Sequence, residues 1–322
     1  MTEFSDRWND EYEVLVIGGG AAGLSGALML ARSRRSVAVI DAGRPRNARA
    51  DGVHGLLARD GMPPAELLER GQAEVRGYGG HVVSGEVGGV VREDGGTFKV
   101  TLADGRVSRA RRLLVTIGLV DELPDVAGLA EHWGRDVIHC PYCHGWEARD
   151  RAIGVLGTSP MSLHQVQLFR QLSDNVALFT HTMPPLTDEQ YEELVARDIS
   201  IVHGVVAAWE SGGVRLADST LIPREVLAVA PRATLRAGFL AALGLRPVEH
   251  PMGMGEYLPA DATGRSSVPG VWLAGNVADP FAQVGAAAAA GAMAGAQINA
   301  DLVAGETRVA VESRATLAAP RP

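Results

Sequence analysis

A buried strand that runs straight into a glycine-rich turn most constrains how this chain can fold. Residues 14–17, Val-Leu-Val-Ile, form a continuous apolar run, which is typical of a parallel strand covered on both faces. The turn that follows contains Gly18, Gly20 and Gly23 in the spacing Gly-x-Gly-x-x-Gly. These glycines permit a tight turn, let the backbone approach a pyrophosphate, and allow close contact between helix and strand. The segment therefore predicts a βαβ unit that binds a dinucleotide.

The residues after this turn complete the unit and limit the choice of dinucleotide. A helix of good helix formers is expected from about residue 21 to 34, and residues 36–40 predict the second strand. That strand ends on Asp41, 18 residues after Gly23, where a carboxylate can accept hydrogen bonds from a ribose. An acid at this position fits FAD or NAD and disfavours a 2′-phosphate. A glycine-rich turn that binds nothing is the alternative, and the strand, helix, strand and acid around the turn argue against it.

Only two cysteines occur among the 322 residues, and both lie in one hexapeptide, Cys140-Pro-Tyr-Cys143-His144-Gly145. Two thiols at this spacing can close a small disulfide ring and reopen it with the transfer of two electrons. A thiolate on the first turn of a helix is stabilised by the helix dipole, so such a pair is typically reactive. We therefore interpret Cys140 and Cys143 as a redox pair.

Three other interpretations of the hexapeptide are weaker. A structural disulfide that closes so short a loop would add little to a domain of this size. Cys-x-x-Cys-His is also the attachment pattern of c-type haem, but that chemistry belongs to exported proteins, and residues 1–7 show no basic-then-apolar signal segment. Structural zinc needs about four ligands, and His139, His144 and the two cysteines would have to supply them from six consecutive residues. We therefore predict no metal site.

The composition excludes several classes of partner. The chain is long enough for two domains with real cores, and 46% of its residues are hydrophobic. Its net charge of −8 argues against a nucleic-acid partner. No apolar run reaches the ~18 to 20 residues that span a bilayer. With no export signal and no surplus cysteine, we expect the reducing cytoplasm, where a disulfide is normally catalytic.

The middle of the chain predicts a second βαβ unit whose binding loop has decayed. A strand ends at Gly157, a helix is expected from Ser162 to Leu172, and residues 176–180 predict a strand. In the loop, Ser159 crowds the space that a pyrophosphate needs, and Pro160 removes a backbone N–H. No arginine pair follows the second strand to hold a 2′-phosphate, so NADPH binding is not expected.

The C-terminal segment predicts a return to the nucleotide sheet. Residues 268–276 form an apolar strand that ends at Gly275-Asn276, and an Ala-rich helix is expected from about Ala286 to Asp301. Such a strand can place a side chain on a ribityl chain and helix amides on a ring carbonyl. A plain βα unit of the core is the alternative. Residues 307–322 are expected to form a loosely ordered tail.

These parts resemble the low-molecular-weight thioredoxin reductases over nearly the whole chain. The resemblance implies an α/β fold with two Rossmann-like, three-layer ββα domains of the dinucleotide-binding type. The FAD domain would be discontinuous, over residues 1–119 and 247–322, and an inserted pyridine-nucleotide-type domain over 120–246 would carry the cysteines. Such proteins are typically homodimers. The motifs that carry the resemblance are the turn at Gly18, Gly20 and Gly23, Thr116-Ile-Gly118, Cys140-x-x-Cys143, Val268-Pro-Gly and Gly275-Asn276.

Several departures from the reductases point to a narrower group. This chain has His144 where the reductases carry Asp, Asn276 where they carry Asp, and Phe281-Ala-Gln283 without the arginine that precedes their flavin-contacting glutamine. Together with Cys-x-x-Cys-His-Gly-Trp and the missing NADPH motif, this set resembles the FAD-dependent dithiol oxidases of gliotoxin, holomycin and romidepsin biosynthesis. Those enzymes close a disulfide in a dithiol natural product and pass the electrons to oxygen.

This resemblance implies a mechanism and a set of cofactor-binding residues. A substrate thiolate would attack Cys140 of a resting Cys140–Cys143 disulfide, His144 would deprotonate the second substrate thiol, and Cys143 would pass electrons to the flavin. Dioxygen would be the acceptor and hydrogen peroxide the product. The implied FAD-binding residues are Gly18, Gly20, Ala22, Gly23, Asp41, Asn47, Val83, Thr116, Gly118, Gly275, Asn276, Gln283 and Val284.

Two rival functions stay open at this point. The first is an NADPH- or ferredoxin-dependent reductase of thioredoxin or another disulfide, with a thioredoxin-like protein as its partner. The second is a redox-sensing flavoprotein that cycles its disulfide without turnover. The sequence does not separate a holothin-like dithiol from a depsipeptide or a small general dithiol.

Overall fold

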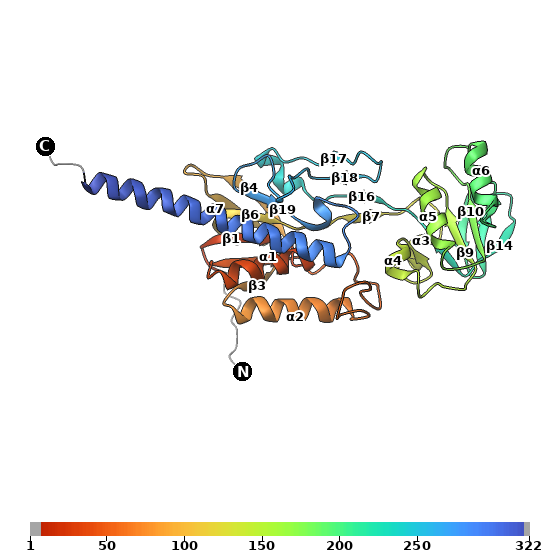
Figure 1. Ribbon diagram of the computed structural model, residues 1–322, viewed down its shortest axis with the longest axis horizontal. Coiled ribbons are helices and arrows are strands. Elements are labelled where there is room, and N and C mark those ends of the chain that lie inside the picture. The colour runs from red at the N-terminus through yellow and green to blue at the C-terminus, as the bar shows by residue number, and fades with distance from the viewer. Residues whose placement is uncertain (1–7, 319–322) are drawn as a thin grey trace. The chain divides into compact units, whose positions relative to one another are not determined.

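The computed structural model describes residues 8–318, which divide into two units (Figure 1). Within that range the first unit takes residues 8–46, 65–120 and 234–318, and the second takes 47–64 and 121–233. The chain passes between the units at β7 (Val120–Glu122) and β16 (Arg232–Thr234), which pair with each other. The predicted domains changed at residues 119/120 and 246/247. The units differ from them mainly in residues 47–64, which pack with the second unit, and in residues 234–246, which pack with the first.

The first unit is built on a sheet with the strand order β3-β2-β1-β6-β5-β4, and β19 also pairs with β6. The strands β1, β2, β3, β6 and β19 are parallel neighbours, whereas β4, β5 and β6 form an antiparallel meander. The elements of this unit are β1 (Glu11–Ile17), α1 (Ala21–Arg32), β2 (Val37–Asp41), α2 (Pro64–Gly77), β3 (His81–Ser84), β4 (Val87–Arg92), β5 (Phe98–Leu102), β6 (Val107–Val115), η1 (Gly238–Leu243), β17 (Val248–Glu249), β18 (Glu256–Tyr257), β19 (Val271–Leu273), η2 (Gly275–Val277) and α7 (Val284–Ala318).

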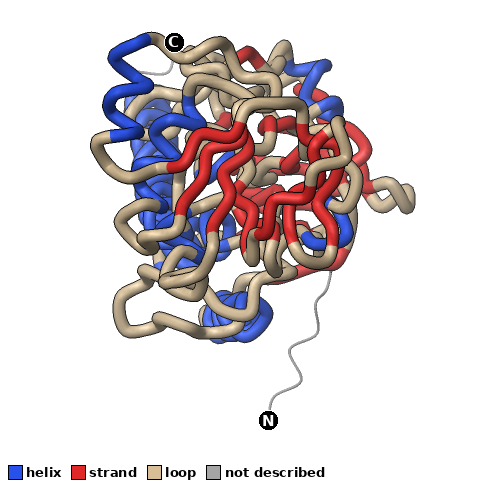
Figure 2. Tube along the Cα trace, turned by 90° about the vertical axis from the view of Figure 1, so that its right-hand side faces the viewer, coloured by secondary structure: helices blue, strands red, loops and turns tan. Residues whose placement is uncertain are grey.

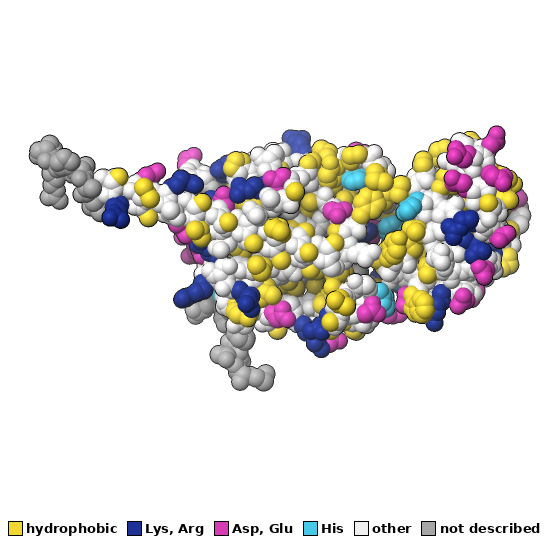
Figure 3. Space-filling model, in the orientation of Figure 1, with side chains coloured by type: hydrophobic (Ala, Val, Ile, Leu, Met, Phe, Trp, Pro, Cys, Tyr) yellow, Lys and Arg dark blue, Asp and Glu magenta, His cyan; other side chains and the backbone are white. Residues whose placement is uncertain are grey.

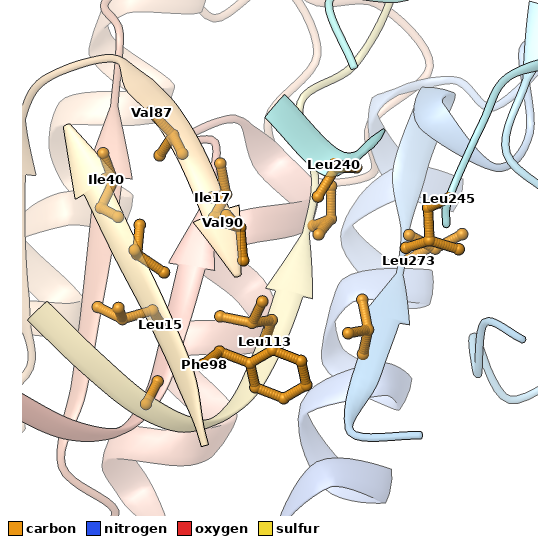
Figure 4. Packing of buried hydrophobic residues seen from close by; sticks show 14 of the residues in the cluster. Leu15, Ile17, Ile40, Val87, Val90, Phe98, Leu113, Leu240, Leu245 and Leu273 are labelled. Atoms are coloured by element: carbon orange, nitrogen blue, oxygen red, sulfur yellow. The ribbon is translucent and has the colours of Figure 1, made fainter. Parts of the chain in front are cut away.

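The apolar run of β1 is continuous because both of its faces are buried. Leu15 and Ile17 belong to a core that β4, β5 and η1 cover, and Figure 4 shows Leu15 near Leu113 and Phe98 of neighbouring strands. Val14 and Val16 belong to a second core that α1 and α7 cover. Alternate side chains of a strand point to opposite faces, so β1 needs apolar residues at every position.

Small residues let α1 and α7 approach each other closely in this second core. A Cβ on Gly291 would overlap the carbonyl oxygen of Ala22, and a Cβ on Gly295 would lie 2.6 Å from the carbonyl oxygen of Gly26. The glycine and alanine content of α7 is therefore explained by helix packing in its first half.

The expectation of a loose C-terminal tail is wrong for the residues that the structure describes. The final helix continues past Asp301 to Ala318, so residues 307–318 are helical. The reason lies in the polar residues at its middle: Glu306 accepts hydrogen bonds from Arg35 at 2.7 Å and from Arg111 at 2.8 Å. These two guanidinium groups lower the pKa of Glu306 to about 2. Residues 319–322 of the expected tail, like residues 1–7, lie outside the described residues.

The second unit repeats the layered plan on a smaller scale. Its parallel sheet has the order β11-β10-β9-β15-β8, and β12, β13 and β14 form a separate antiparallel sheet. Figure 2, which faces this unit, shows its strands running alongside one another. The elements are α3 (Leu129–His132), β8 (Val137–Ile138), α4 (Pro141–His144), β9 (Ile153–Leu156), α5 (Met161–Phe169), β10 (Val176–Phe179), α6 (Asp188–Val195), β11 (Ser200–Val202), β12 (Val206–Glu210), β13 (Gly213–Leu216), β14 (Leu221–Pro223) and β15 (Val226–Ala228).

Two cores cover the two faces of this parallel sheet. Phe169 of α5 packs with Ile153 on one face, and Trp209 of β12 packs with Phe179 on the other. Each unit therefore has helices on one face of a parallel sheet and antiparallel strands on the other, and the predicted fold class is confirmed. None of the helices in residues 8–318 combines the length and hydropathy that a membrane span requires.

A candidate redox active site

The glycine turn of the first unit is locked onto the end of β6. Gly18 has φ +111°, and a Cβ there would overlap the carbonyl oxygen of Thr116. A Cβ on Gly23 would overlap the carbonyl oxygen of Gly18. The hydroxyl of Thr116 donates to the carbonyl oxygens of Ile17 at 3.1 Å and Gly18 at 2.9 Å. The chain itself therefore requires glycine at positions 18 and 23, and Thr116 fixes the turn.

Gly20 differs from its neighbours because it faces open space. No atom of the chain lies within 4 Å of a Cβ built on Gly20. Gly20 is also the N-cap of α1, and no side chain caps that helix end. Free N–H groups at a helix N-terminus bind phosphate groups, and a glycine there lets the pyrophosphate come close. These residues fit the pyrophosphate of a dinucleotide such as FAD.

The other residues predicted to bind FAD lie at several places in the chain. Asp41 ends β2 and accepts a hydrogen bond from the Gly43 N–H at 3.1 Å. Asn276 donates to the carbonyl oxygens of Ala282 at 2.8 Å and Asp279 at 3.1 Å, so it shapes the loop that precedes α7. Asn47 lies in the second unit, and its role stays a prediction. The remaining positions are Ala22 in α1, Val83 in β3, Gly118 with φ +66°, Gly275 with φ +75°, the exposed Gln283, and Val284, the first residue of α7.

The two cysteines lie at the start of the short helix α4. Cys140 is the N-cap, Pro141 is the first helical residue, and the Cys143 N–H donates to Cys140 Sγ at 3.2 Å. Both cysteines are half-buried, and the resting disulfide stays a prediction. A hydrogen bond to sulfur favours the thiolate, so this geometry suits Cys140 as a leaving group.

Glycine at position 145 is required by this turn. A Cβ on Gly145 would overlap the carbonyl oxygen of Pro141 and the side chain of Leu172. The next residue along, Trp146, is 65% exposed. The final glycine of the hexapeptide therefore serves packing, and α4 can lie close to the end of α5.

His144 has the environment of a base. Its Nε2 atom is fully buried and finds no hydrogen-bond partner among residues 8–318. Burial lowers the pKa of His144, the nearby charges of Glu147 and Asp51 raise it, and that of His54 lowers it. A lowered pKa keeps the imidazole neutral at pH 7, so that it can accept a proton.

Two residues near the cysteines were missed at the sequence level. Gln165 of α5 is buried, and its Nε2 donates to the carbonyl oxygen of His139 at 2.7 Å, directly before Cys140. His54 Nε2 lies 3.6 Å from Glu147 Oε1. No spacing in the sequence connects residues 54 and 165 with the hexapeptide, because only the packed fold brings them together.

In the corresponding loop of the second βαβ unit, backbone groups are hydrogen-bonded to a side chain of the loop itself. Ser162 Oγ accepts a hydrogen bond from the Thr158 N–H at 3.2 Å and donates to the Leu156 carbonyl oxygen at 3.3 Å. A Cβ on Gly157 would lie 2.6 Å from Met183 Sδ. A backbone N–H that a phosphate would use is thus already bonded within the loop, and Pro160 has none to offer.

His181, which follows β10, also has a structural partner. Its Nδ1 accepts a hydrogen bond from the Val206 N–H at 3.0 Å, and burial lowers its pKa. Within residues 8–318, no group of three or more His, Cys, Asp or Glu side chains could hold a metal ion.

A Cys-x-x-Cys pair on one Rossmann-like unit and a glycine turn of the dinucleotide-binding type on the other are the features of a flavin-dependent thiol:disulfide oxidoreductase. Residues 12–295 match the pyridine nucleotide-disulphide oxidoreductase family, and the chain belongs to that family. Its thioredoxin reductase-like members bind FAD, and FAD is the cofactor of this chain. The resemblance to such flavoproteins is confirmed.

The most informative relatives cover nearly the whole chain. Thioredoxin reductase tcpT of Claviceps purpurea is 30% identical over 91% of this chain and 94% of its own length. The crystal structure of HlmI is 43% identical, covers 97% of this chain and 99% of its own, and superposes with a TM-score of 0.89. A thioredoxin reductase TrxB of Bacillus anthracis, described as putative, is 26% identical over 92% of this chain and 99% of its own, with a TM-score of 0.85.

Proposed function

We propose that this protein is an FAD-dependent dithiol oxidase. It closes an intramolecular disulfide in a small dithiol, of the kind found in antibiotic and other natural-product biosynthesis, through the Cys140–Cys143 pair. The electrons go to dioxygen, and hydrogen peroxide is the second product. The observation that carries the proposal is the hydrogen bonding within the loop of the second βαβ unit. The Thr158 N–H already donates to Ser162 Oγ, and Pro160 has no N–H to offer a phosphate. An enzyme of this class without NADPH must take its electrons from another donor, and a dithiol is the donor that a cysteine pair accepts.

The cysteines exchange disulfides with the substrate. A substrate thiolate attacks Cys140 Sγ, the Cys140–Cys143 bond breaks, and Cys143 leaves as a thiolate. The second substrate thiol then attacks the substrate sulfur of this mixed disulfide, and Cys140 leaves. The Cys143 N–H, 3.2 Å from Cys140 Sγ, stabilises that leaving thiolate. The substrate loses two electrons, and the cysteine pair gains them.

His144 takes the proton of the second substrate thiol. A free thiol is only a few per cent ionised at neutral pH, so a neutral imidazole beside it accelerates the attack. Burial lowers the pKa of His144 and keeps it in that neutral form. When bound, FAD supplies a two-electron acceptor that dioxygen can reoxidise.

The relatives support both this function and one rival. The sequence resemblance to dithiol oxidases rests on Cys-x-x-Cys-His-Gly-Trp, and HlmI matches at 43% identity. Other relatives are named thioredoxin reductases, and the β9–α5–β10 unit is complete as a scaffold. The second candidate is therefore an NADPH- or ferredoxin-dependent disulfide reductase with a thioredoxin-like partner.

One anaerobic experiment separates the two. The visible flavin band of the purified holoprotein is followed after addition of NADPH to one cuvette and a small dithiol to another, and air is then admitted. Bleaching by the dithiol alone, with return of the band and stoichiometric peroxide in air, is the expected result. Fast bleaching by NADPH would identify the reductase instead. Bleaching by the dithiol without peroxide or sustained oxygen uptake would leave two candidate functions, a ferredoxin-dependent reductase and a redox-sensing flavoprotein.

Two properties implied by the resemblance belong to the same proposal, namely a homodimer and a cytoplasmic location. Hydrophobic side chains lie on the exposed surface of α7, where Met293 is 52% and Val309 62% exposed, and Figure 3 shows hydrophobic groups scattered over that face. A long helix with exposed apolar residues suits contact with a second copy. Light scattering of the holoprotein should give twice the chain mass of 33.9 kDa.

A further inference from the structure

We propose that Glu147, held in place by His54, orients His144 and stabilises its protonated form during turnover. Glu147 and His54 would then be positioning residues for the base. The inference rests on the proposed function in one respect, because it takes His144 to be the group that accepts the proton of a substrate thiol.

The backbone places Glu147 on the same side as His144. The Ala148 N–H donates to the His144 carbonyl oxygen at 3.3 Å, and the Gly145 N–H donates to the Pro141 carbonyl oxygen at 3.0 Å. The helix α4 ends at His144, and the chain continues as hydrogen-bonded turns in which Glu147 follows His144 by three residues. His144 Nε2 is buried without a partner, so an imidazolium formed there needs a nearby negative charge.

A second imidazole, that of His54, lies beside the same carboxylate. His54 Nε2 lies 3.6 Å from Glu147 Oε1, and His54 Nδ1 lies 3.6 Å from Asp60 Oδ2. Asp60 Oδ1 also accepts the Gly55 N–H at 2.9 Å. Carboxylate and imidazole therefore alternate in the series of neighbouring side chains Asp60, His54 and Glu147, and His144 is the next member of the series.

The segment that carries His54 is itself fixed to the second unit. Val53 is buried and exchanges two backbone hydrogen bonds with the Gly61–Met62 stretch, both at 2.8 Å. Arg49 donates to the carbonyl oxygen of Ala130 at 2.9 Å. Since residues 47–64 belong to this unit, His54 has a defined position relative to α4.

The charges around His144 agree with this arrangement. From the segment 47–64, Asp51 raises the pKa of His144 and His54 lowers it, whereas Glu147, from the chain that follows α4, raises it. The thiols of Cys140 and Cys143 are on the same short helix. Among the charges that raise the pKa of His144 against the effect of burial, that of Glu147 has the largest effect. The side chain of Glu147 is 47% exposed, so a proton can pass from these side chains to water. The step moves one proton from a substrate thiol to the imidazole of His144 and transfers no electrons.

The test compares Glu147→Gln with Glu147→Asp, which keeps the charge, and with Glu193→Gln on α6 as a matched control. Two readouts are taken across pH: the rate of anaerobic flavin bleaching by a dithiol, and the NMR titration of His144, assigned with His144→Asn. Removing the negative charge should move the His144 titration and the acidic limb of the rate profile to lower pH. The plateau rate should fall about two- to fivefold, because a weaker base remains. Glu147→Asp should restore most of both effects, and Glu193→Gln should behave as wild type.

A double variant tests the role of His54. His54→Asn alone should slow bleaching in the same direction as Glu147→Gln, and the double variant should be no slower than Glu147→Gln, because both act through one contact. A Glu147→Gln protein whose rate falls at all pH values without movement of the His144 titration would overturn the proposal, as would unchanged rates. A wild-type protein that no dithiol bleaches, but whose His144 titration still moves in Glu147→Gln, would overturn the oxidase function and leave the coupling of the two residues established.

Discussion

The two βαβ units of this chain share one topology and differ at five of the six positions of their loops, residues 18–23 and 157–162. In the first unit the Gly18 N–H donates to the carbonyl oxygen of Ile40 at 2.8 Å, and in the second the Gly157 N–H donates to that of Phe179 at 2.7 Å. In both units, the end of the first strand is therefore hydrogen-bonded to the second strand in the same way. After that point Gly20 and Gly23 of the first loop correspond to Ser159 and Ser162 of the second.

These replacements change the hydrogen-bond partners of the backbone N–H groups in the loop. At position 23 a Cβ would overlap the Gly18 carbonyl oxygen, so the first loop tolerates only glycine and leaves its helix end uncapped. Ser162 has a Cβ and an Oγ that bonds to two backbone groups of its own loop. The proposed loss of a dinucleotide site would leave the scaffold intact, because the sheet and helix do not depend on a free helix N-terminus.

The largest effect is expected for a substitution of a cysteine in the second unit. Cys143→Ser should keep FAD and its visible spectrum, because Cys143 belongs to the second unit and the glycine turn to the first. A serine cannot form the disulfide that stores the two electrons, so bleaching by a dithiol should slow more than about a thousandfold. Stopped-flow measurement of the flavin band checks this, and a variant that bleaches at the normal rate would refute the cysteine assignment.

The next effect in size concerns His144. His144→Ala should slow bleaching by a dithiol about a hundredfold at pH 7, within the range of general-base catalysis, and leave the flavin spectrum similar. The wild-type rate should fall as the pH drops, since protonation removes the base, and the variant should lack that dependence. Equal rates in the two proteins across pH would make His144 a bystander.

The same histidine makes a prediction about stability. Burial lowers the pKa of His144 below its ordinary value of 6.5, so the unfolded chain binds a proton more readily than the folded chain. Its contribution to stability is therefore present above pH 6.5 and is lost as the pH falls through the folded pKa. Urea unfolding should show a smaller loss on acidification for His144→Asn than for wild type. His181→Asn should act in the same direction, because burial also lowers the pKa of His181.

A substitution in the first loop separates ligand binding from folding. Gly20 has φ −77° and faces open space, so Gly20→Ala should fold normally. A methyl group where the pyrophosphate approaches should weaken FAD binding about ten- to hundredfold. Flavin release on a desalting column and circular dichroism of the apoprotein measure the two effects. Gly23→Ala is the contrasting variant, because it should lower the melting temperature of the apoprotein as well. A Gly20→Ala protein that retains its flavin as tightly as wild type would place the cofactor elsewhere.

The sequence predicted these loops well because their chemistry is local. A run such as Val14–Ile17 followed by a glycine spacing determines strand, turn and helix within about thirty residues. The cysteine pair was likewise expected on the first turn of a helix, and it lies there, with Cys140 as the N-cap of α4 and Pro141 as its first residue.

The rest of the site depends on contacts that are distant in sequence. His54 meets Glu147 across 93 positions because residues 53–62 fold back on themselves and pack with the second unit. Gln165 reaches the carbonyl of His139 only because α5 lies beside the β8–α4 turn. The continuation of the C-terminal helix past Asp301 was missed for a similar reason, since Glu306 is held by Arg35 and Arg111 from other elements.

The smallest effect tests whether the second loop is really closed by Ser162. Ser162→Ala keeps the Cβ and removes the hydroxyl, so the Thr158 N–H and the Leu156 carbonyl oxygen lose their partner. The cost should be about 1 to 3 kcal/mol of unfolding free energy, which a shift of several degrees in the melting temperature would reveal. Ser159→Ala, in the same loop, is the control and should stay within about 0.5 kcal/mol of wild type. Flavin content should not change, and NADPH should still fail to bleach the flavin, because a freed N–H does not replace the missing arginines. If Ser162→Ala instead gained NADPH-dependent bleaching, the hydroxyl alone would be the block, and the two βαβ units would differ by one side chain rather than by a whole binding surface.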